Sequence, residues 1–544
     1  MDFTNDWELY EKGIDYKTRI NLYKEVEDNN RFFQGDQWHG VKSEGLPTPV
    51  FNIIKPVLRY KISRIMQNNI KIRYTYENYN EKDSEKMNKA CELLTEKAQQ
   101  LWEQLKMDFH NEELLKDGAI SGDGIAYFYY DDKKDKMRIE LIDNTNIYPS
   151  NPNYANVQEQ DYIIIAFRRT VESVRKEALS NGIKKELADM IVADSDTMYT
   201  AGALGKIEQD DSNMCTVLLK LWKDSNTQTV HFSKSTKDIV ICDAKDTGCE
   251  LYPIAMLNWE TRKNCFHGAS DVTGLIPNQL YINKIAAMVM LSTMYTAFPK
   301  MVYDENLVDN PSNQIGVAIG VNGSDKPINS IIDYITPASV SNDAFGMFER
   351  TIAMTKELMG ANDGALGAIN PELASGKSIL AVMEQAAQPL ENIKRRFYNY
   401  IEDVALIWAD IIRAYCSKEF LSVKLSENNN VSLIDADTLN KMLLSVKIDV
   451  GPSTKWSEVA TIEALDSLLN NNHITFDMYI ELLPKNCGIP KEKILQMISE
   501  KENKVKLPEN EDEVLAMLNE DERMEAIKNP QIITNKLEQM VTNN

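Results

Sequence analysis

The chain has 544 residues and a formal net charge of −22, from 60 basic and 82 acidic side chains. Its length predicts two to four folded cores. The acidic balance argues against a large surface that grips DNA, because tight phosphate binding needs clustered Lys and Arg, but it does not exclude DNA that slides past. Seven irregularly spaced cysteines favour free thiols in a reducing compartment. The N-terminus lacks an apolar run, so no signal peptide is expected.

The first 120 residues are predicted to be mostly helical. Apolar residues recur at three- and four-residue steps within residues 16–33, 49–67 and 81–116. The last of these stretches predicts a buried stripe of Leu94, Ala98, Leu101, Leu105 and Phe109.

The period changes at Ser121, where β-type patterns begin. Residues 124–130 and 137–142 are predicted strands joined by a polar hairpin turn at 131–136. Further strands are expected at 161–169, 214–222, 227–232 and 239–242, with helices within 171–193. The middle third is therefore predicted to be an α+β domain.

A long helix is predicted at residues 271–298, and it is followed by about forty residues rich in Pro, Asn and Gly. Within this excursion, Asn322-Gly323 predicts a hairpin turn. Helix resumes at 343–359. The uncharged stretch 285–298 is shorter than the roughly 20 residues that a bilayer span needs, so we expect it to be buried between protein neighbours. A membrane-associated scaffold is the less favoured alternative.

A Gly-rich loop at 360–377 leads into a second long helix at 378–416. Apolar side chains follow helical spacing from Met383 to Tyr415, and Pro389 is expected to kink the helix near Gln385. Beyond it, a strand is predicted at 446–450 and helices at 457–470 and 491–499, before an acidic tail.

Enzymatic motifs are weak in this sequence. Gly376-Lys377-Ser378 lacks the first glycine of a phosphate loop, because Pro371 stands there, so helix capping by Ser375 or Ser378 is favoured. His267 and Ser270 lie near Asp271 without the surroundings of a nucleophilic serine, and an N-terminal helix cap by Ser270 or Asp271 is the favoured interpretation. No catalytic residue, metal site or cofactor is predicted. The alternative is a nucleotide-dependent, nucleic-acid-processing enzyme that uses Lys377 and Ser378.

Several segments resemble tailed-bacteriophage portal proteins, the subunits of head-to-tail connector rings. They are residues 31–38 (RFFQGDQW), 52–55, 117–127, 253–259 (PIAMLNW), 268–272, 277–283 and 297–300. Their order, together with the helix–tip–helix–loop–helix plan, carries the resemblance over roughly residues 14–416. It implies an α+β, mainly helical portal fold.

The resemblance also implies a division of the chain. The expected parts are a wing at 1–264 with a long helix at 378–416, a first stem helix at 265–298, a clip at 299–342, a second stem helix at 343–359, a tunnel loop at 360–377, and a crown with an acidic tail at 417–544.

The function that the resemblance implies is not enzymatic. Portal proteins form a dodecameric ring at one capsid vertex, through which double-stranded DNA is packaged and ejected. The implied partners are the terminase large subunit, the major capsid and scaffolding proteins, and a head-completion or adaptor protein. The expected location is the virion, after assembly in the host cytoplasm, with no cofactor and no membrane.

Three groups of site residues follow from this resemblance. The DNA-channel candidates are Asn362, Asp363, Leu366, Asn370, Glu372, Lys377 and Lys356, of which the two lysines could equally be ordinary solvent-exposed side chains. The subunit-interface candidates are Ile282, Ile285, Val289, Phe345, Phe348, Ile352 and Met359. The clip candidates for motor docking are Asp304, Glu305, Asp309 and Lys326.

Overall fold

The computed structural model describes most of the first 415 residues and short stretches beyond them. The described residues are 4–43, 45–67, 70–76, 84–131, 133–194, 213–297, 300–308, 311, 319–322, 325, 327–335, 342–360, 388–415, 423–424, 431–432, 444–450, 462, 465–471 and 473–483. The chain divides into two compact units, residues 1–451 and 452–544.

Five helices form the N-terminal part of the first unit, as predicted in kind but not in extent. They are α1 (Thr4–Arg19), α2 (Leu22–Gln34), α3 (Ile54–Ile65), α4 (Ser84–Gln104) and α5 (Met107–Ser121). The single helices predicted at 16–33 and 81–116 are wrong, because Asn21 and Lys106 adopt left-handed backbone conformations with φ of 60° and 51°. The break at Lys106 also shifts the helical phase, and Phe109 is 57% exposed instead of buried.

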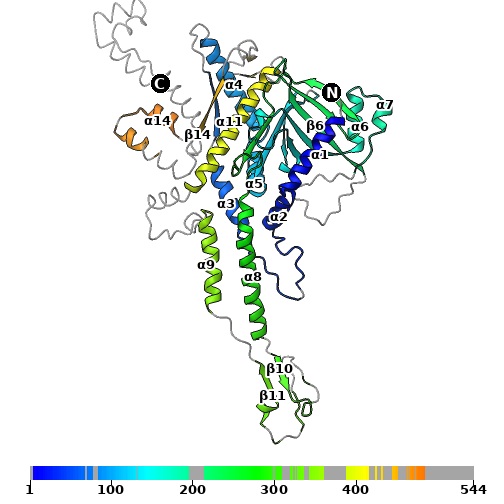
Figure 1. Ribbon diagram of the computed structural model, residues 1–544. Helices are drawn as coiled ribbons and strands as arrows, with labels where there is room; N and C mark the ends of the chain where they lie inside the picture. The colour runs from blue at the N-terminus through cyan, green and yellow to red at the C-terminus, as the bar shows by residue number, and fades with distance from the viewer. Residues whose placement is uncertain are drawn as a thin grey trace, which may run out of the picture. The chain divides into compact units, whose positions relative to one another are not determined.

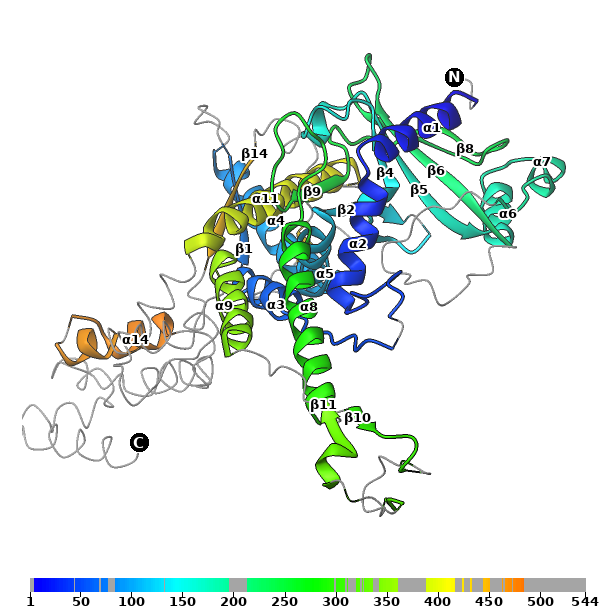
Figure 2. The same ribbon diagram turned by 60° about the horizontal axis from the view of Figure 1, so that its bottom comes forward.

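A five-stranded antiparallel sheet is the larger of the two main sheets. Its order is β4 (Ile147–Pro149), β5 (Tyr162–Thr170), β6 (Met214–Lys223), β7 (Val230–Ser235) and β8 (Val240–Asp246). Helices α6 (Val171–Ser180) and α7 (Lys185–Asp189) lie at one end, and α1 packs against the sheet through Trp7 and Tyr10 (Figure 2). The four strands predicted at 161–242 and the helices between them are confirmed, with bounds shifted by a few residues.

A three-stranded sheet lies against α5. It pairs β3 (Lys136–Ile142) with β2 (Asp123–Asp131), and β2 with β9 (Ile254–Asn258). Helix α5 approaches β2 so closely that a Cβ atom at Gly124 would lie 2.5 Å from the Leu114 carbonyl oxygen. Only glycine fits this position, and the predicted hairpin of β2 and β3 is confirmed.

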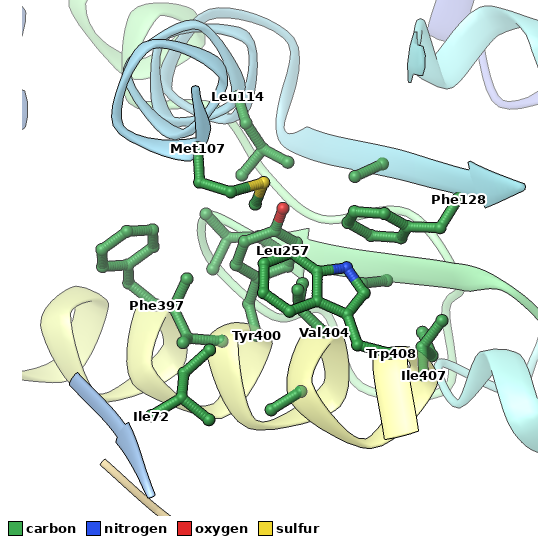
Figure 3. Close-up of a cluster of buried hydrophobic side chains, with 14 of the residues drawn as sticks. Ile72, Met107, Leu114, Phe128, Leu257, Phe397, Tyr400, Val404, Ile407 and Trp408 are labelled. Atoms are coloured by element: carbon green, nitrogen blue, oxygen red, sulfur yellow. The ribbon is translucent and has the colours of Figure 1, made fainter. Parts of the chain in front are cut away.

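The main hydrophobic core lies between α11 (Glu391–Ala414), α5 and the three-stranded sheet. Figure 3 shows Trp408, Val404 and Phe397 of α11 pointing toward Met107 of α5 and Phe128 of β2. The rings of Phe128 and Trp408 meet edge to face, 6.1 Å apart. The apolar spacing predicted for this helix is therefore confirmed where the helix is described.

The long helix predicted at 378–416 does not pass through Pro389. Residues Gln388–Leu390 form a 3₁₀ turn, and α11 begins at Glu391. Proline has no backbone N–H and fixes its own φ, so a helix start is the less costly place for it. Residues 378–387, including the kink expected near Gln385, lie outside the described part of the chain.

A strand from late in the sequence joins this core. β14 (Leu444–Val450), predicted in part at 446–450, pairs antiparallel with β1 (Ile70–Tyr76), with Ile448 opposite Ile72. β1 was not predicted. Two two-residue strands, β12 (Val423–Lys424) and β13 (Val431–Ser432), pair with each other.

A pair of helices extends away from the sheets. α8 (Asp271–Ala297) and α9 (Asn342–Leu358) run side by side and end near a small hairpin of β10 (Lys300–Tyr303) and β11 (Ile332–Ile335) (Figure 1). Both predicted helices are confirmed. Residues 319–322 form no strand, and Gly323, half of the expected turn, lies outside the described residues.

The second unit is described only over residues 462, 465–471 and 473–483. It contains α14 (Phe476–Leu482), capped by the Thr475 side chain, and a small cluster of Leu465, Ile480 and Leu483. The helix predicted at 457–470 is seen at 465–470, the one at 491–499 lies outside the described residues, and α14 was not predicted. Among the helices described in either unit, none has the length and apolar content to cross a membrane.

Substitutions of Trp408 test how much its packing in the main hydrophobic core contributes to stability. Trp408→Ala should lower the free energy of unfolding by about 3–5 kcal/mol, because it leaves a large cavity. Trp408→Phe should cost less, since the Trp408 Nε1 atom has no hydrogen-bond partner among the described residues. Denaturant unfolding followed by circular dichroism measures both variants, and equal costs would contradict this account.

A substitution of Asp117, near the end of α5, tests whether a buried carboxyl group lowers the stability of the fold at neutral pH. Burial, and then the nearby Asp143 carboxylate, raises the pKa of Asp117 to about 7, far above that of an unfolded chain. The folded state therefore binds the extra proton between about pH 4 and pH 7, and stability falls as pH rises through this window.

We expect Asp117→Asn to raise the free energy of unfolding at pH 8 by about 1–2 kcal/mol, a value discounted for partial exposure. The gain should shrink toward pH 4. Thermal unfolding across pH, with exposed Asp161→Asn as the control, measures it. A gain that does not depend on pH would refute the assignment.

Candidate functional site

The start of α8 is fixed to the first unit by short polar contacts. Ser270 Oγ accepts the Val272 N–H at 2.9 Å and donates to the Ala119 carbonyl of α5 at 2.8 Å. Asp271 forms an ion pair of 2.7 Å with the buried Lys61 of α3. Ser270 thus caps the helix, as the sequence suggested, and α8 leaves the core in a defined direction.

A buried aspartate–histidine pair lies just before this cap. Asp123 Oδ2 is 2.8 Å from His267 Nδ1, and Asp123 Oδ1 accepts the Gly268 N–H at 2.7 Å and the Asn258 amide at 2.8 Å. Burial lowers the pKa of His267, and Asp123 offsets part of this effect.

This pair does not form a hydrolytic triad. His267 Nε2 has no hydrogen-bond partner among the described residues, and Ser270 is used for capping. A nucleophile would have to be hydrogen-bonded to the free ring nitrogen. The aspartate that holds His267 is Asp123, 144 residues away in the sequence, which agrees with the rejection of a triad of His267, Ser270 and Asp271.

Two buried amides one turn apart on α8 hold a loop from the N-terminal region. We call residues 36–43 and 45–52 the anchored loop. Gln279 Nε2 donates to the Phe51 carbonyl at 2.7 Å, and Gln279 Oε1 accepts the Ile53 N–H at 3.0 Å. Asn283 Oδ1 accepts the Phe51 N–H at 3.1 Å, and Asn283 Nδ2 donates to Gln37 Oε1 at 2.6 Å.

The other end of the loop is closed by its own contacts. Gln37 Nε2 donates to the Phe32 carbonyl at 2.9 Å, and Trp38 Nε1 donates to the Pro49 carbonyl at 2.8 Å. Gly35, with φ of 101°, ends α2 in a left-handed conformation that favours glycine. The RFFQGDQW segment therefore serves to tie the anchored loop to α8.

The facing surfaces of α8 and α9 are covered by the chain itself. Ile282 and Ile285 of α8 are buried, and Val289, Phe348, Ile352 and Met359 are half-buried. Phe348 meets Phe51 of the anchored loop edge to face at 5.6 Å. Ile282 and Ile285, chosen as subunit-interface candidates, thus have almost no exposed surface. Phe345 lies in α9, but its side chain is outside the described part.

A second set of apolar side chains on the same helices is exposed. On α9 these are Met347, Met354 and Leu358, which we call the outer stripe. On α8 they are Tyr281, Met288, Met290, Met294 and Tyr295. The outer stripe starts one residue before the inward-facing Phe348, so the two stripes lie about 100° apart around α9. Helical spacing alone would have shown both stripes, but not which of them the chain covers.

The small hairpin beyond the paired helices contains two of the docking candidates. Asp304 Oδ1 accepts the Asn306 N–H at 3.1 Å, and the Asp304 N–H donates to the Ile331 carbonyl at 2.9 Å, so Asp304 shapes a turn. Glu305 is exposed beside it. Asp309 and Lys326 lie outside the described residues.

The remaining candidates fall largely outside the described chain. These are Asn362, Asp363, Leu366, Asn370, Glu372, Lys377 and Ser378, and the last two also form the alternative nucleotide site. Lys356 is described and lies half-buried on α9. Within the described residues, no three His, Cys, Asp or Glu side chains are grouped to hold a metal ion.

The architecture is α+β, with a pair of helices, α8 and α9, that extends away from the sheets (Figure 1). A family model described as Phage P22-like portal protein matches residues 8–148 and 128–543, nearly the whole sequence. The chain belongs to this family, which confirms the resemblance to tailed-phage portal proteins. Among curated proteins, none matches the chain. Family membership makes the protein a structural component of the virion, in an oligomeric ring that meets capsid and DNA.

A substitution of Asn283 tests whether its hydrogen bonds hold the anchored loop against α8. Asn283→Ala leaves the Phe51 N–H and Gln37 Oε1 without a partner, at a cost of about 1–3 kcal/mol for each buried group. We expect faster hydrogen–deuterium exchange across residues 36–52, with unchanged exchange in the five-stranded sheet. The control is Asn278→Ala, because the Asn278 amide makes a long 3.4 Å hydrogen bond to Thr355 and does not contact the anchored loop within the described residues. Unchanged exchange of the loop would contradict the role of Asn283.

Proposed function

We propose that this chain is the subunit of a dodecameric portal ring at one capsid vertex, the channel through which double-stranded DNA is packaged and ejected. In this proposal α8 and α9 are the stem, and the segment 299–342, which contains the hairpin of β10 and β11, is the clip. Residues 1–264 together with residues 378–416, which include α11, are the wing, 360–377 the tunnel loop, and 417–544 the crown.

The exposed apolar surface of the paired helices is the observation that carries the ring proposal. α9 needs one apolar stripe to pack on α8, and its outer stripe is left facing solvent, with Leu358 78% exposed. Contiguous exposed apolar side chains of this kind mark an interface. Obligate interfaces usually exceed ~2,000 Å², which neighbouring helical pairs in a ring can provide.

The hairpin supports docking of further proteins. It lies at the end of the paired helices opposite the sheets (Figure 1) and exposes Val302, Tyr334 and Ile335 next to Glu305. In the proposal it binds the terminase large subunit during packaging and a head-completion or adaptor protein afterwards. The major capsid and scaffolding proteins then contact the wing.

The charge of the chain fits a channel more closely than a DNA clamp. A ring of chains that each carry −22 repels phosphate, so DNA is not held by counterion release. Lys356 and the tunnel loop residues are proposed to face the channel. The protein is proposed to have no catalytic activity and no cofactor.

Met354 provides the test. Wild-type protein should form rings with a central hole, seen by negative-stain electron microscopy and by light scattering. Met354→Asp should prevent them by placing a charge in the outer stripe, whereas Met190→Asp, directly after α7, should not. These methionines are 63% and 64% exposed, so they are matched. Ile352→Asp is a less clean test, because Ile352 is half-buried in the chain's own packing.

A wild-type protein that stays monomeric at high concentration would refute the proposal. Nucleotide binding in calorimetry that is lost on Lys377→Ala would instead support the nucleotide-dependent enzyme.

A further inference from the structure

The anchored loop carries exposed apolar side chains that its own chain leaves uncovered. Val41 and Leu46 are each more than half exposed, although the loop is short and tied down at both ends. In both views most of the loop lies on the side of α8 away from α9 (Figures 1 and 2), and its end at Phe51 reaches Phe348 of α9. Gln279 and Asn283, which hold the loop, point to that side.

Two exposed methionines of α8 continue this surface beyond the loop. Met290 lies seven residues after Asn283, and Met294 lies one further turn along, so both fall near the loop-holding side of the helix. The loop and these methionines form one apolar flank of the helical pair. The outer stripe of α9 forms a different flank.

A closed ring needs two such unlike surfaces on each subunit. In cyclic symmetry above two-fold, every contact joins one surface of a subunit to a different surface of the next. The family forms oligomeric rings, and the described part of this helical pair offers two apolar flanks separated by α8. Their charges are compatible, because the exposed Lys42 follows Val41 in the loop and the exposed Glu357 precedes Leu358 in the outer stripe.

We propose that the anchored loop, with Met290 and Met294, is the receiving surface for the outer stripe of α9 from the neighbouring copy of this chain. This inference rests on the proposed ring. It adds a specific contact: Val41 and Leu46 of one subunit against Met354 and Leu358 of the next. Lys42 then lies near Glu357 of that neighbour.

The attachment of the loop makes this contact effective. A mobile loop would lose conformational freedom on docking, which weakens association. Here the amides of Gln279 and Asn283 and the Trp38–Pro49 hydrogen bond fix the loop within the subunit. The loop therefore presents Val41 and Leu46 as part of a preformed surface.

The first experiment compares two leucines of similar exposure. Leu46→Asp should raise the protein concentration needed for half-maximal ring assembly at least tenfold, while Leu187→Asp on α7 should leave it unchanged. Leu46 and Leu187 are 53% and 45% exposed. Circular dichroism must show both variants folded. Equal assembly of folded Leu46→Asp and wild-type protein would overturn the inference.

The second experiment identifies the neighbour directly. Val41→Cys combined with Leu358→Cys, treated with a short bismaleimide after assembly, should give a ladder of covalent oligomers on denaturing gels. Each single-cysteine variant and the Val41→Cys, Met190→Cys pair control for the native cysteines and should give no ladder. Rings that form without the ladder in the Val41–Leu358 pair would overturn the contact.

Charge reversal separates this contact from general loss of apolar surface. Lys42→Glu and Glu357→Lys should each weaken assembly about two- to fivefold, and the double variant should restore it. Additive losses in the double variant would count against the pairing. Wild-type protein is scored in every series: failure of wild type to form rings refutes the proposed function, whereas normal wild-type rings with unaffected loop variants refute this inference alone.

Discussion

Two buried amides on α8 determine how the helical pair is joined to the rest of the first unit. Gln279 and Asn283 replace water as partners for the backbone at Phe51 and Ile53. Because each of these groups is costly to leave unpaired in the interior, the loop and the start of α3 cannot shift along α8 without losing several bonds together. With the Ser270 cap and the Lys61–Asp271 ion pair, they make the first half of α8 a rigid extension of the core.

The second half of α8 follows a different principle. The last buried side chain of α8 is Ala286, and from Ala287 onward the described side chains are half-buried or exposed. A helix of this kind gains most of its stability from packing on one face, and here that face is only partly covered by α9. The first unit thus covers the apolar side chains around α11 but leaves apolar side chains of the helical pair exposed. Membership in a ring-forming family accounts for this difference.

The sequence predicted those elements whose physical cause is local. The apolar content of their sequences predicted α8 and α9, and Ser270 marked the start of α8. The alternation of apolar and polar residues around a polar turn predicted the β2–β3 hairpin. The sequence could not predict contacts set by distant parts, such as Ile72 opposite Ile448 or Asp123 beside His267. Apolar spacing showed that Ile282 and Ile285 are buried, but it could not tell that their own chain buries them instead of a neighbour.

The chemistry of the two kinds of contact differs in a way that suits their roles. Within the subunit, the anchored loop is held by directional amide hydrogen bonds, which specify one register and tolerate no substitute geometry. On the flanks proposed to meet other subunits, methionine recurs at positions 290, 294, 347 and 354. Methionine is flexible and adapts to irregular partners at little cost. A ring that closes from identical subunits, each slightly rotated from the last, requires a rigid helical pair whose flanks can adapt to a neighbour. The distribution of polar and apolar residues around α8 provides both properties.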